Sequence, residues 1–275
     1  MDITRRAVLA AGGGIATSAM LGPMGIARAA GFPGKRPPVA ERRFVSQAVE
    51  REIARISGMI ADPELAWLFG NCYPNTLDTT VAMGTVESKP DAFVITGDIP
   101  CLWLRDSAAQ VRPYLHLVKQ DAALRELFRG LIGRHARSVL IDPYANAFMH
   151  NPDEKTSLVW AKEDDTEMRP GVAERKWEID SLCYVVRLAY GYWRETGDKA
   201  PFDAAWAESA RAIVRTFREQ QRKDGPGPYK FQRTNKQPSE TLQAGLGLPT
   251  RKVGLIHSAF RPSDDACSCL PTCSR

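Results

Sequence analysis

Apolar residues recur at helical spacing through most of this chain, and this periodicity limits the possible folds more than any other feature. In the stretch that starts at Phe44, apolar residues alternate with charged ones, so one face of a helix points to a core. Asp62-Pro63 ends that stretch. We expect helices over residues 44–60, 107–118, 122–141, 178–195 and 202–222.

Residues 71–100 interrupt the helical pattern. They are rich in Thr, Val and Gly, and the apolar run 92–95 lies between Pro90 and Gly97-Asp98. Such a run predicts a short strand or extended segment followed by a turn. Since 44% of the 275 residues are hydrophobic, the chain can form one good-sized core or two small ones. Long helices joined by aromatic and charged loops are typical of helical barrels, whose loops gather functional groups at one end.

The N-terminus has the features of an export signal. Arg5-Arg6 precedes an apolar, Gly- and Ala-rich run that ends in the small residues of 27–30, and paired arginines favour the twin-arginine route. A membrane anchor is the alternative, but glycines and Pro23 interrupt a run that is short for a bilayer span. We therefore expect cleavage of residues 1–30, an extended lead-in over 31–43, and a periplasmic or extracellular protein without membrane attachment.

Charge and cysteine distribution exclude two further classes of protein. The net charge is +5, but Lys and Arg are scattered among Asp and Glu, so no nucleic-acid-binding face is expected. Cys72, Cys101 and Cys183 are isolated in sequence, and Cys183 falls in a helical apolar pattern that predicts a buried free thiol. The three cysteines within 267–273 have no nearby histidine and no second pair at zinc-finger spacing, so no metal site is expected.

The first motif that suggests chemistry is Trp103-Leu104-Arg105-Asp106, which follows a turn where a helix is expected. An indole ring can cover the apolar face of a sugar, while a guanidinium and a carboxylate bind its hydroxyls. The structural alternative is that Asp106 or Ser107 caps the helix and Asp106 pairs with Arg105.

Two further motifs are weaker when each is considered alone. His150-Asn151 lies in an expected loop, where a lone histidine is more often a structural hydrogen-bonding group than a catalyst. Trp177, Glu178 and Asp180 surround the start of the 178–195 helix, where acidic residues also stabilise the helix N-terminus.

The last motif, 261–265, contains Arg261 and the adjacent carboxyls Asp264 and Asp265. Such a pair can mark a helix cap, a cation site or an acid and its neighbour. A like charge raises the pKa of a carboxyl, which suits a general acid at neutral pH. In a glycosidase this acid protonates the leaving oxygen while a second carboxylate activates water or attacks the sugar.

Taken in order, the blocks 96–107, 176–184 and 260–266 resemble the signature blocks of glycoside hydrolase family 125. Its members are metal-independent, exo-acting α-1,6-mannosidases with an (α/α)6 barrel and an inverting mechanism. The resemblance implies an all-α fold, no cofactor, an α-mannoside oligosaccharide or N-glycan fragment as substrate, and Asp265, or else Asp264, as general acid. The candidates for the sugar-binding rim are Trp103, Arg105, Asp106, His150, Asn151, Trp177, Glu178, Asp180 and Arg261.

The sequence departs from the family pattern at its end. Family members continue past the Asp-Asp pair into further barrel helices that carry the general base, a glutamate, whereas residues 267–275 have neither helical periodicity nor apolar mass. We therefore expect a partial catalytic domain over 44–266, an atypical tail over 267–275, and weak or absent hydrolysis. The alternatives are a non-catalytic mannose-binding fragment and another helical-barrel glycosidase, such as one that acts on glucosides.

Overall fold

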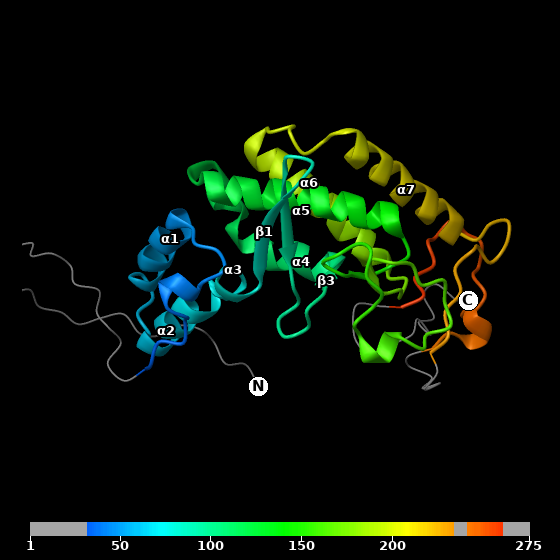
Figure 1. Ribbon diagram of the computed structural model, residues 1–275, viewed down its shortest axis with the longest axis horizontal. Coiled ribbons are helices and arrows are strands. Elements are labelled where there is room, and N and C mark those ends of the chain that lie inside the picture. Colours follow the sequence, from blue (N-terminus) through cyan, green and yellow to red (C-terminus); the bar gives the residue numbers. More distant parts are fainter. Residues whose placement is uncertain (1–31, 234–240, 261–275) are drawn as a thin grey trace, which may run out of the picture.

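The computed structural model describes residues 32–233 and 241–260, in which seven α-helices dominate over five short strands (Figure 1). The predicted all-α class and helical-barrel architecture are confirmed, with the strands confined to connections. The helices are α1 (Gln47–Ser57), α2 (Pro63–Cys72), α3 (Asn75–Thr79), α4 (Leu104–Val111), α5 (Ala122–Ile141), α6 (Ile179–Thr196) and α7 (Ala204–Gln220). The strands are β1 (Val81–Val86), β2 (Lys89–Val94), β3 (Leu102–Trp103), β4 (Ala147–Phe148) and β5 (Val172–Glu174).

Four of the five predicted helices, α1, α5, α6 and α7, match their expected ranges closely, and β2 confirms the predicted strand. The range 107–118 is divided between α4, which begins three residues earlier than predicted, and the 3-10 helix η2 (Arg112–Gln120). Pro113 lies at the start of η2, where its missing N–H removes a helical hydrogen bond.

The sequence analysis does not predict α2, because it takes Asp62-Pro63 only as a helix end, or α3, which lies within the non-helical range 71–100. In the structure Asp62 and Pro63 also begin α2. The Asp62 carboxylate accepts hydrogen bonds from the backbone N–H groups of Glu64 and Leu65, and Pro63 occupies the first helical position. A proline costs little there because that N–H has no partner within the helix.

Consecutive long helices alternate between two layers. Helix α4 packs against α6 in one layer, and α5 packs against α7 in the other (Figure 1). The β1–β2 hairpin lies across α5, where Gly130 permits close approach, since a Cβ at this position would lie 2.8 Å from backbone atoms of Asp91 and Ala92. This alternation is the arrangement expected of an α/α barrel.

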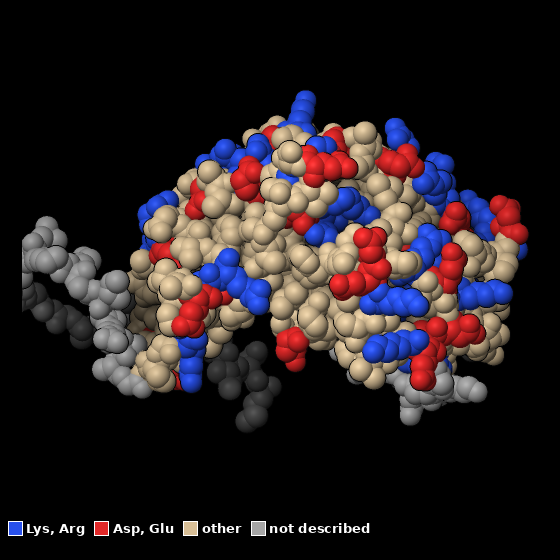
Figure 2. Space-filling view, in the orientation of Figure 1, with Lys and Arg blue, Asp and Glu red and all other residues tan. Residues whose placement is uncertain are grey.

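The surface and the cysteines test several expectations from composition. Charges of both signs are mixed over the face seen in Figure 2, and no described helix is long and apolar enough to cross a membrane. Cys72, Cys101 and Cys183 are free thiols. The prediction that Cys183 is buried is wrong: this residue is exposed on α6, whereas Cys101 is the buried one. Residues 1–30 and 267–273 lie outside the described residues.

Candidate functional site

A three-stranded antiparallel sheet, in the order β3-β4-β5, brings two of the predicted motifs together. Trp103 pairs with Ala147, and Ala147 pairs in turn with Glu174. The chain therefore enters α4 and leaves β5 at the same end of the sheet. As a result, Arg105 and Asp106 come close to Asp180, although more than seventy residues separate them in sequence.

Asn146 forms hydrogen bonds to both segments, the start of α4 and the residues that follow β5. Its backbone oxygen accepts a hydrogen bond from the Leu104 N–H at 3.0 Å, and its side-chain Oδ1 accepts one from the Lys176 N–H at 3.1 Å. Its Nδ2 donates to the Glu174 carboxylate at 2.9 Å. Because Asn146 is buried, these bonds replace its contacts with water and fix the two motifs relative to each other.

The segment that precedes Arg261 lies beside the second motif. The Phe260 N–H donates to the Trp177 oxygen at 2.9 Å, and the Ile179 N–H donates to the Ser258 hydroxyl at 3.1 Å. Glu178 and Phe260 form a parallel bridge. The structure thus joins the block around Trp177 to the start of the block 260–266, as their order in the sequence suggested. Arg261, Asp264 and Asp265 themselves lie outside the described residues.

Arg105 lies between two carboxylates. Its Nε is 3.1 Å from Asp180 Oδ2, and its Nη2 is 3.5 Å from Asp106 Oδ2. Despite these distances, no described residue supplies an aligned hydrogen bond to four buried atoms: Arg105 Nε, Asp106 Oδ2 and both Asp180 carboxylate oxygens. Buried polar atoms without partners are rare, and a group of them indicates a site where a polar ligand supplies the missing bonds.

The Glu178 carboxyl adds an unusual protonation state to this group. Glu178 is 7% exposed, and burial, together with the negative charges of Asp180 and Glu174, raises its pKa from 4.5 to about 8. Burial also raises the pKa of Asp180, against the opposing attraction of Arg105. At neutral pH the Glu178 carboxyl is therefore protonated and can donate a hydrogen bond to a ligand oxygen.

Asp106 and Asp180 lie in the first turns of α4 and α6, where a negative charge stabilises the helix N-terminus, but the residues at the capping positions add no side-chain bond. Trp103 is the N-terminal cap residue of α4 and Glu178 that of α6, and neither side chain makes a capping hydrogen bond. Asp106 lies inside the first turn of α4. The Ser107 hydroxyl donates to the Trp103 oxygen at 2.7 Å and lies 2.8 Å from Nε2 of the buried His135, which ties the start of α4 to α5.

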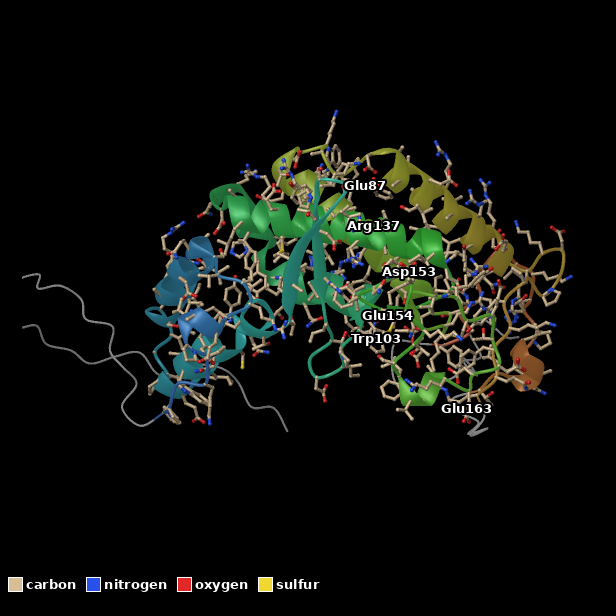
Figure 3. The ribbon with its side chains drawn as sticks, viewed as in Figure 1. Glu87, Trp103, Arg137, Asp153, Glu154 and Glu163 are labelled. Carbon is tan, nitrogen blue, oxygen red and sulfur yellow. The ribbon has the colours of Figure 1, made fainter. Side chains whose placement is uncertain are left out.

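The two tryptophans of these motifs lie in different environments. Trp103 is half-buried where β3 meets α4, and Figure 3 shows it below Glu87, which marks the tip of the β1–β2 hairpin. Trp177 is 1% exposed, and its indole N–H donates to the His257 oxygen at 2.7 Å. Trp103 can therefore present a ring face to a sugar, whereas Trp177 supports the segment that carries Glu178.

His150 and Asn151 follow the opposite end of β4 from the Arg105 group. The exposed His150 ring contacts Phe93 edge-on, with 4.8 Å between ring centroids. The Asn151 side chain accepts a hydrogen bond from the Asp153 N–H at 3.0 Å and so stabilises a turn. The structure therefore does not place these two candidates in the carboxylate group.

Residues behind the site were not predicted from the sequence. Arg233 donates to both Asp164 oxygens at 2.8 and 2.9 Å and to Glu174 at 2.9 Å, and Trp160 donates to Glu174 at 3.2 Å. Arg233, Asp164 and Glu174 are buried, and together they hold the charge of Glu174 near Glu178. The only sequence signal was a set of isolated charged residues in loops, which is equally typical of a solvated surface.

The comparisons with known proteins agree with this arrangement. The family described as metal-independent alpha-mannosidase (GH125) matches residues 62–271. A meiotically up-regulated gene 157 protein of Schizosaccharomyces pombe is 40% identical over 254 residues, which cover 86% of this chain and 49% of that protein.

A solved structure from Streptococcus pneumoniae, described as a metal-independent alpha mannosidase in a non-productive complex with alpha-1,6-mannobiose, is also similar. It has a TM-score of 0.75 and 39% sequence identity, over 82% of this chain and 52% of that chain. This chain therefore spans about half the length of both relatives.

Proposed function

The chain belongs to the GH125 family of metal-independent α-mannosidases, and from that premise we propose that it acts on terminal α-1,6-linked mannose, with inversion at the anomeric carbon. The observation that carries this proposal is a group of buried polar atoms on Arg105, Asp106 and Asp180, which form ion pairs with one another but no aligned hydrogen bond to a described residue. A mannose ring supplies several hydroxyls, each of which can donate and accept, so it can complete these bonds.

We assign different roles to the residues around this group. Trp103 covers an apolar face of the sugar, Arg105 donates to its oxygens, and Asp106 and Asp180 accept from its hydroxyls. The protonated Glu178 donates a further hydrogen bond. Sugar recognition is thereby shared between an aromatic surface and charged hydrogen-bonding groups.

The proposed general acid is Asp265, with Asp264 as the alternative. Support comes from the hydrogen bond that holds Phe260 against Trp177, five residues before Asp265. Inversion requires a second carboxylate that activates water on the opposite side of the ring, with about 6.5–9.5 Å between the carboxyl groups. Because the chain spans half the length of its relatives, we propose that the 275 residues bind mannose but hydrolyse the glycosidic bond weakly or not at all.

Binding and turnover of α-1,6-mannobiose by the purified 275-residue chain test these parts separately. We expect saturable binding by calorimetry, and any product observed by NMR to form first as β-mannose. Fast turnover that Asp265→Asn abolishes, but the exposed control Asp224→Asn does not, would contradict the proposed impairment while supporting the acid. Turnover that survives both Asp265→Asn and Asp264→Asn would refute the acid assignment.

A mannose-binding role without catalysis is the second candidate, and the half-length match favours it. It predicts binding that is lost in Trp103→Ala and no release of mannose under any condition. A panel of aryl α-mannosides and α-glucosides distinguishes both candidates from a glycosidase of another specificity.

We also propose export through the twin-arginine pathway, on the basis of Arg5-Arg6 and the small residues of 27–30. N-terminal sequencing of the protein from the periplasm or medium is expected to start at residue 31. An Arg5→Lys, Arg6→Lys double variant should remain in the cytoplasm; unchanged export of this variant would refute the route.

A further inference from the structure

Trp160 combines an exposed ring with a fixed orientation. It lies on the short 3-10 helix η3 (Val159–Ala161) and is 46% exposed. Its indole N–H donates to Glu174 Oε1 at 3.2 Å, so the edge of the ring that carries the nitrogen points inward. An exposed indole that is already held in place loses little conformational entropy when a ligand covers it. The surroundings of η3 indicate which ligand this is.

The segment that contains η3 is packed beside the proposed sugar site. Leu158 and Ala161 belong to a small buried apolar cluster, and Trp103 packs against the same cluster. The Thr156 hydroxyl donates to the Ala173 oxygen at 2.6 Å and so attaches this segment to β5. Two partly exposed indole rings, one in the proposed sugar site and one on η3, therefore share a single support.

A row of charged side chains leads from Trp160 to the proposed sugar site. Arg175 and Trp177 contact the same tyrosine ring in the core. The residues that alternate with them, Glu174, Lys176 and Glu178, interact with one another instead. This alternation is that of an extended chain, in which four residues span about 13 Å. The row is therefore longer than one pyranose ring.

The two ends of the row offer different groups to a ligand. The Glu178 end lies beside Arg105 and Asp180, where the terminal mannose is proposed to bind. At the other end, Lys176 Nζ is 3.9 Å from Glu174 Oε1, which is too long for a hydrogen bond. The ammonium group therefore keeps donors for a ligand, next to the exposed ring of η3.

We propose that the Trp160 end of this row binds the second sugar of an α-mannoside, the ring that is joined to the terminal mannose. The indole covers an apolar face of that ring, and Lys176 donates to one of its hydroxyls. The preferred ligand is then an oligosaccharide of at least two pyranose rings. This inference rests on the proposed function, because it takes the position of the terminal mannose from it.

Calorimetry on the purified 275-residue chain tests the proposal with methyl α-mannoside, which has one ring, and α-1,6-mannobiose, which has two. We expect wild type to bind the mannobiose at least about fivefold more tightly. Trp160→Ala should remove most of this difference and leave the affinity for methyl α-mannoside unchanged. Trp160→Phe keeps an aromatic ring without the N–H and should retain most of the affinity for mannobiose.

Trp193→Ala is the matched control, because Trp193 is also an exposed tryptophan but lies on α6. This variant should bind both sugars as wild type does. Near-ultraviolet circular dichroism verifies that each variant is folded.

The results that would overturn the proposal differ from those that would overturn the proposed function. Equal affinity of wild type for the two sugars, or unchanged mannobiose affinity in Trp160→Ala, would exclude a second-ring site and leave the mannose site intact. An equal loss for both sugars in Trp160→Ala would place the effect at the mannose site. Binding as weak in Trp160→Phe as in Trp160→Ala would assign the effect to the hydrogen bond with Glu174. Wild type that binds neither sugar would refute the proposed function and this inference with it.

Discussion

Replacement of Glu178 by glutamine should make the protein more stable at alkaline pH while leaving it nearly unchanged at pH 4.5. Glutamine has the shape of the protonated acid but cannot ionise. In the folded protein Glu178 holds its proton up to a pKa of about 8, whereas a carboxyl in the unfolded chain releases its proton near 4.5. The wild-type chain therefore loses stability as the pH rises from about 4.5 through 8, and the variant does not.

The size of the effect follows from the difference in pKa. Each unit corresponds to about 1.4 kcal/mol, so a difference between 4.5 and about 8 gives an upper value of about 5 kcal/mol. Since Glu178 interacts with Asp180 and Glu174, part of the shift belongs to the group as a whole. We therefore expect Glu178→Gln to raise the free energy of unfolding by about 3–5 kcal/mol at pH 9 relative to wild type.

Urea unfolding followed by tryptophan fluorescence, at unit steps from pH 5 to 9, measures this difference. Glu126→Gln, at an exposed carboxyl on α5, serves as the control and should follow the wild-type curve. A difference between wild type and Glu178→Gln that stays constant within about 0.5 kcal/mol over this range would refute the reasoning. So would a direct titration of the Glu178 carboxyl near 4.5 by NMR.

Four further substitutions probe the site and its support. Asp180→Asn removes a negative charge beside Glu178 and should lower the Glu178 pKa, which carboxyl NMR would show; an unchanged pKa would contradict the assigned cause. Trp103→Ala should weaken α-1,6-mannobiose binding by about 1–3 kcal/mol by calorimetry, and unaltered affinity would exclude the ring as a sugar platform. Asn146→Ala leaves buried partners unpaired and should lower the free energy of unfolding, measured in urea, by about 2–4 kcal/mol. A decrease below about 0.5 kcal/mol would contradict the role of Asn146. Gly130→Ala forces the hairpin away from α5 and should lower the free energy of unfolding in the same urea assay by about 1–3 kcal/mol. A variant as stable as wild type would refute the close contact.

Local periodicity predicted the long helices because each buries one face, and a face leaves a repeating pattern in the sequence. Helix α5 begins and ends where the pattern of apolar residues predicted. Helix α2 was missed because one dipeptide, Asp62-Pro63, both follows one helix and starts the next. A capping signal does not by itself tell on which side of it the helix lies.

The site was predictable only in part, for a different reason. Motif order identified the Arg105 and Glu178 segments, but their approach depends on the short β3-β4-β5 sheet and on Asn146, which a linear pattern does not reveal. Cys183 also shows that a local pattern does not reveal tertiary contacts. Its apolar pattern predicted burial, yet no described element covers that side of α6. The pattern records that a face is suited to packing, without recording what packs on it.

A short internal repeat explains why the site holds an extra proton. Trp103 and Asp106 have the same spacing as Trp177 and Asp180. Each copy places an aspartate in the first turn of one of two adjacent helices. Only the first copy supplies a cation, since Arg105 corresponds to Ile179, which packs against the core.

One guanidinium therefore faces the carboxylates of both copies, and the second copy adds Glu178 where the first has the buried Leu104. Arg105 and the buried Lys176 favour the ionised form of Glu178, but burial and the negative charges of Asp180 and Glu174 outweigh them. Retention of the proton on Glu178 costs less than burial of that charge. The repeated motif thus produces two acceptors and one donor carboxyl from three acidic residues, a combination suited to a ligand whose hydroxyls both donate and accept.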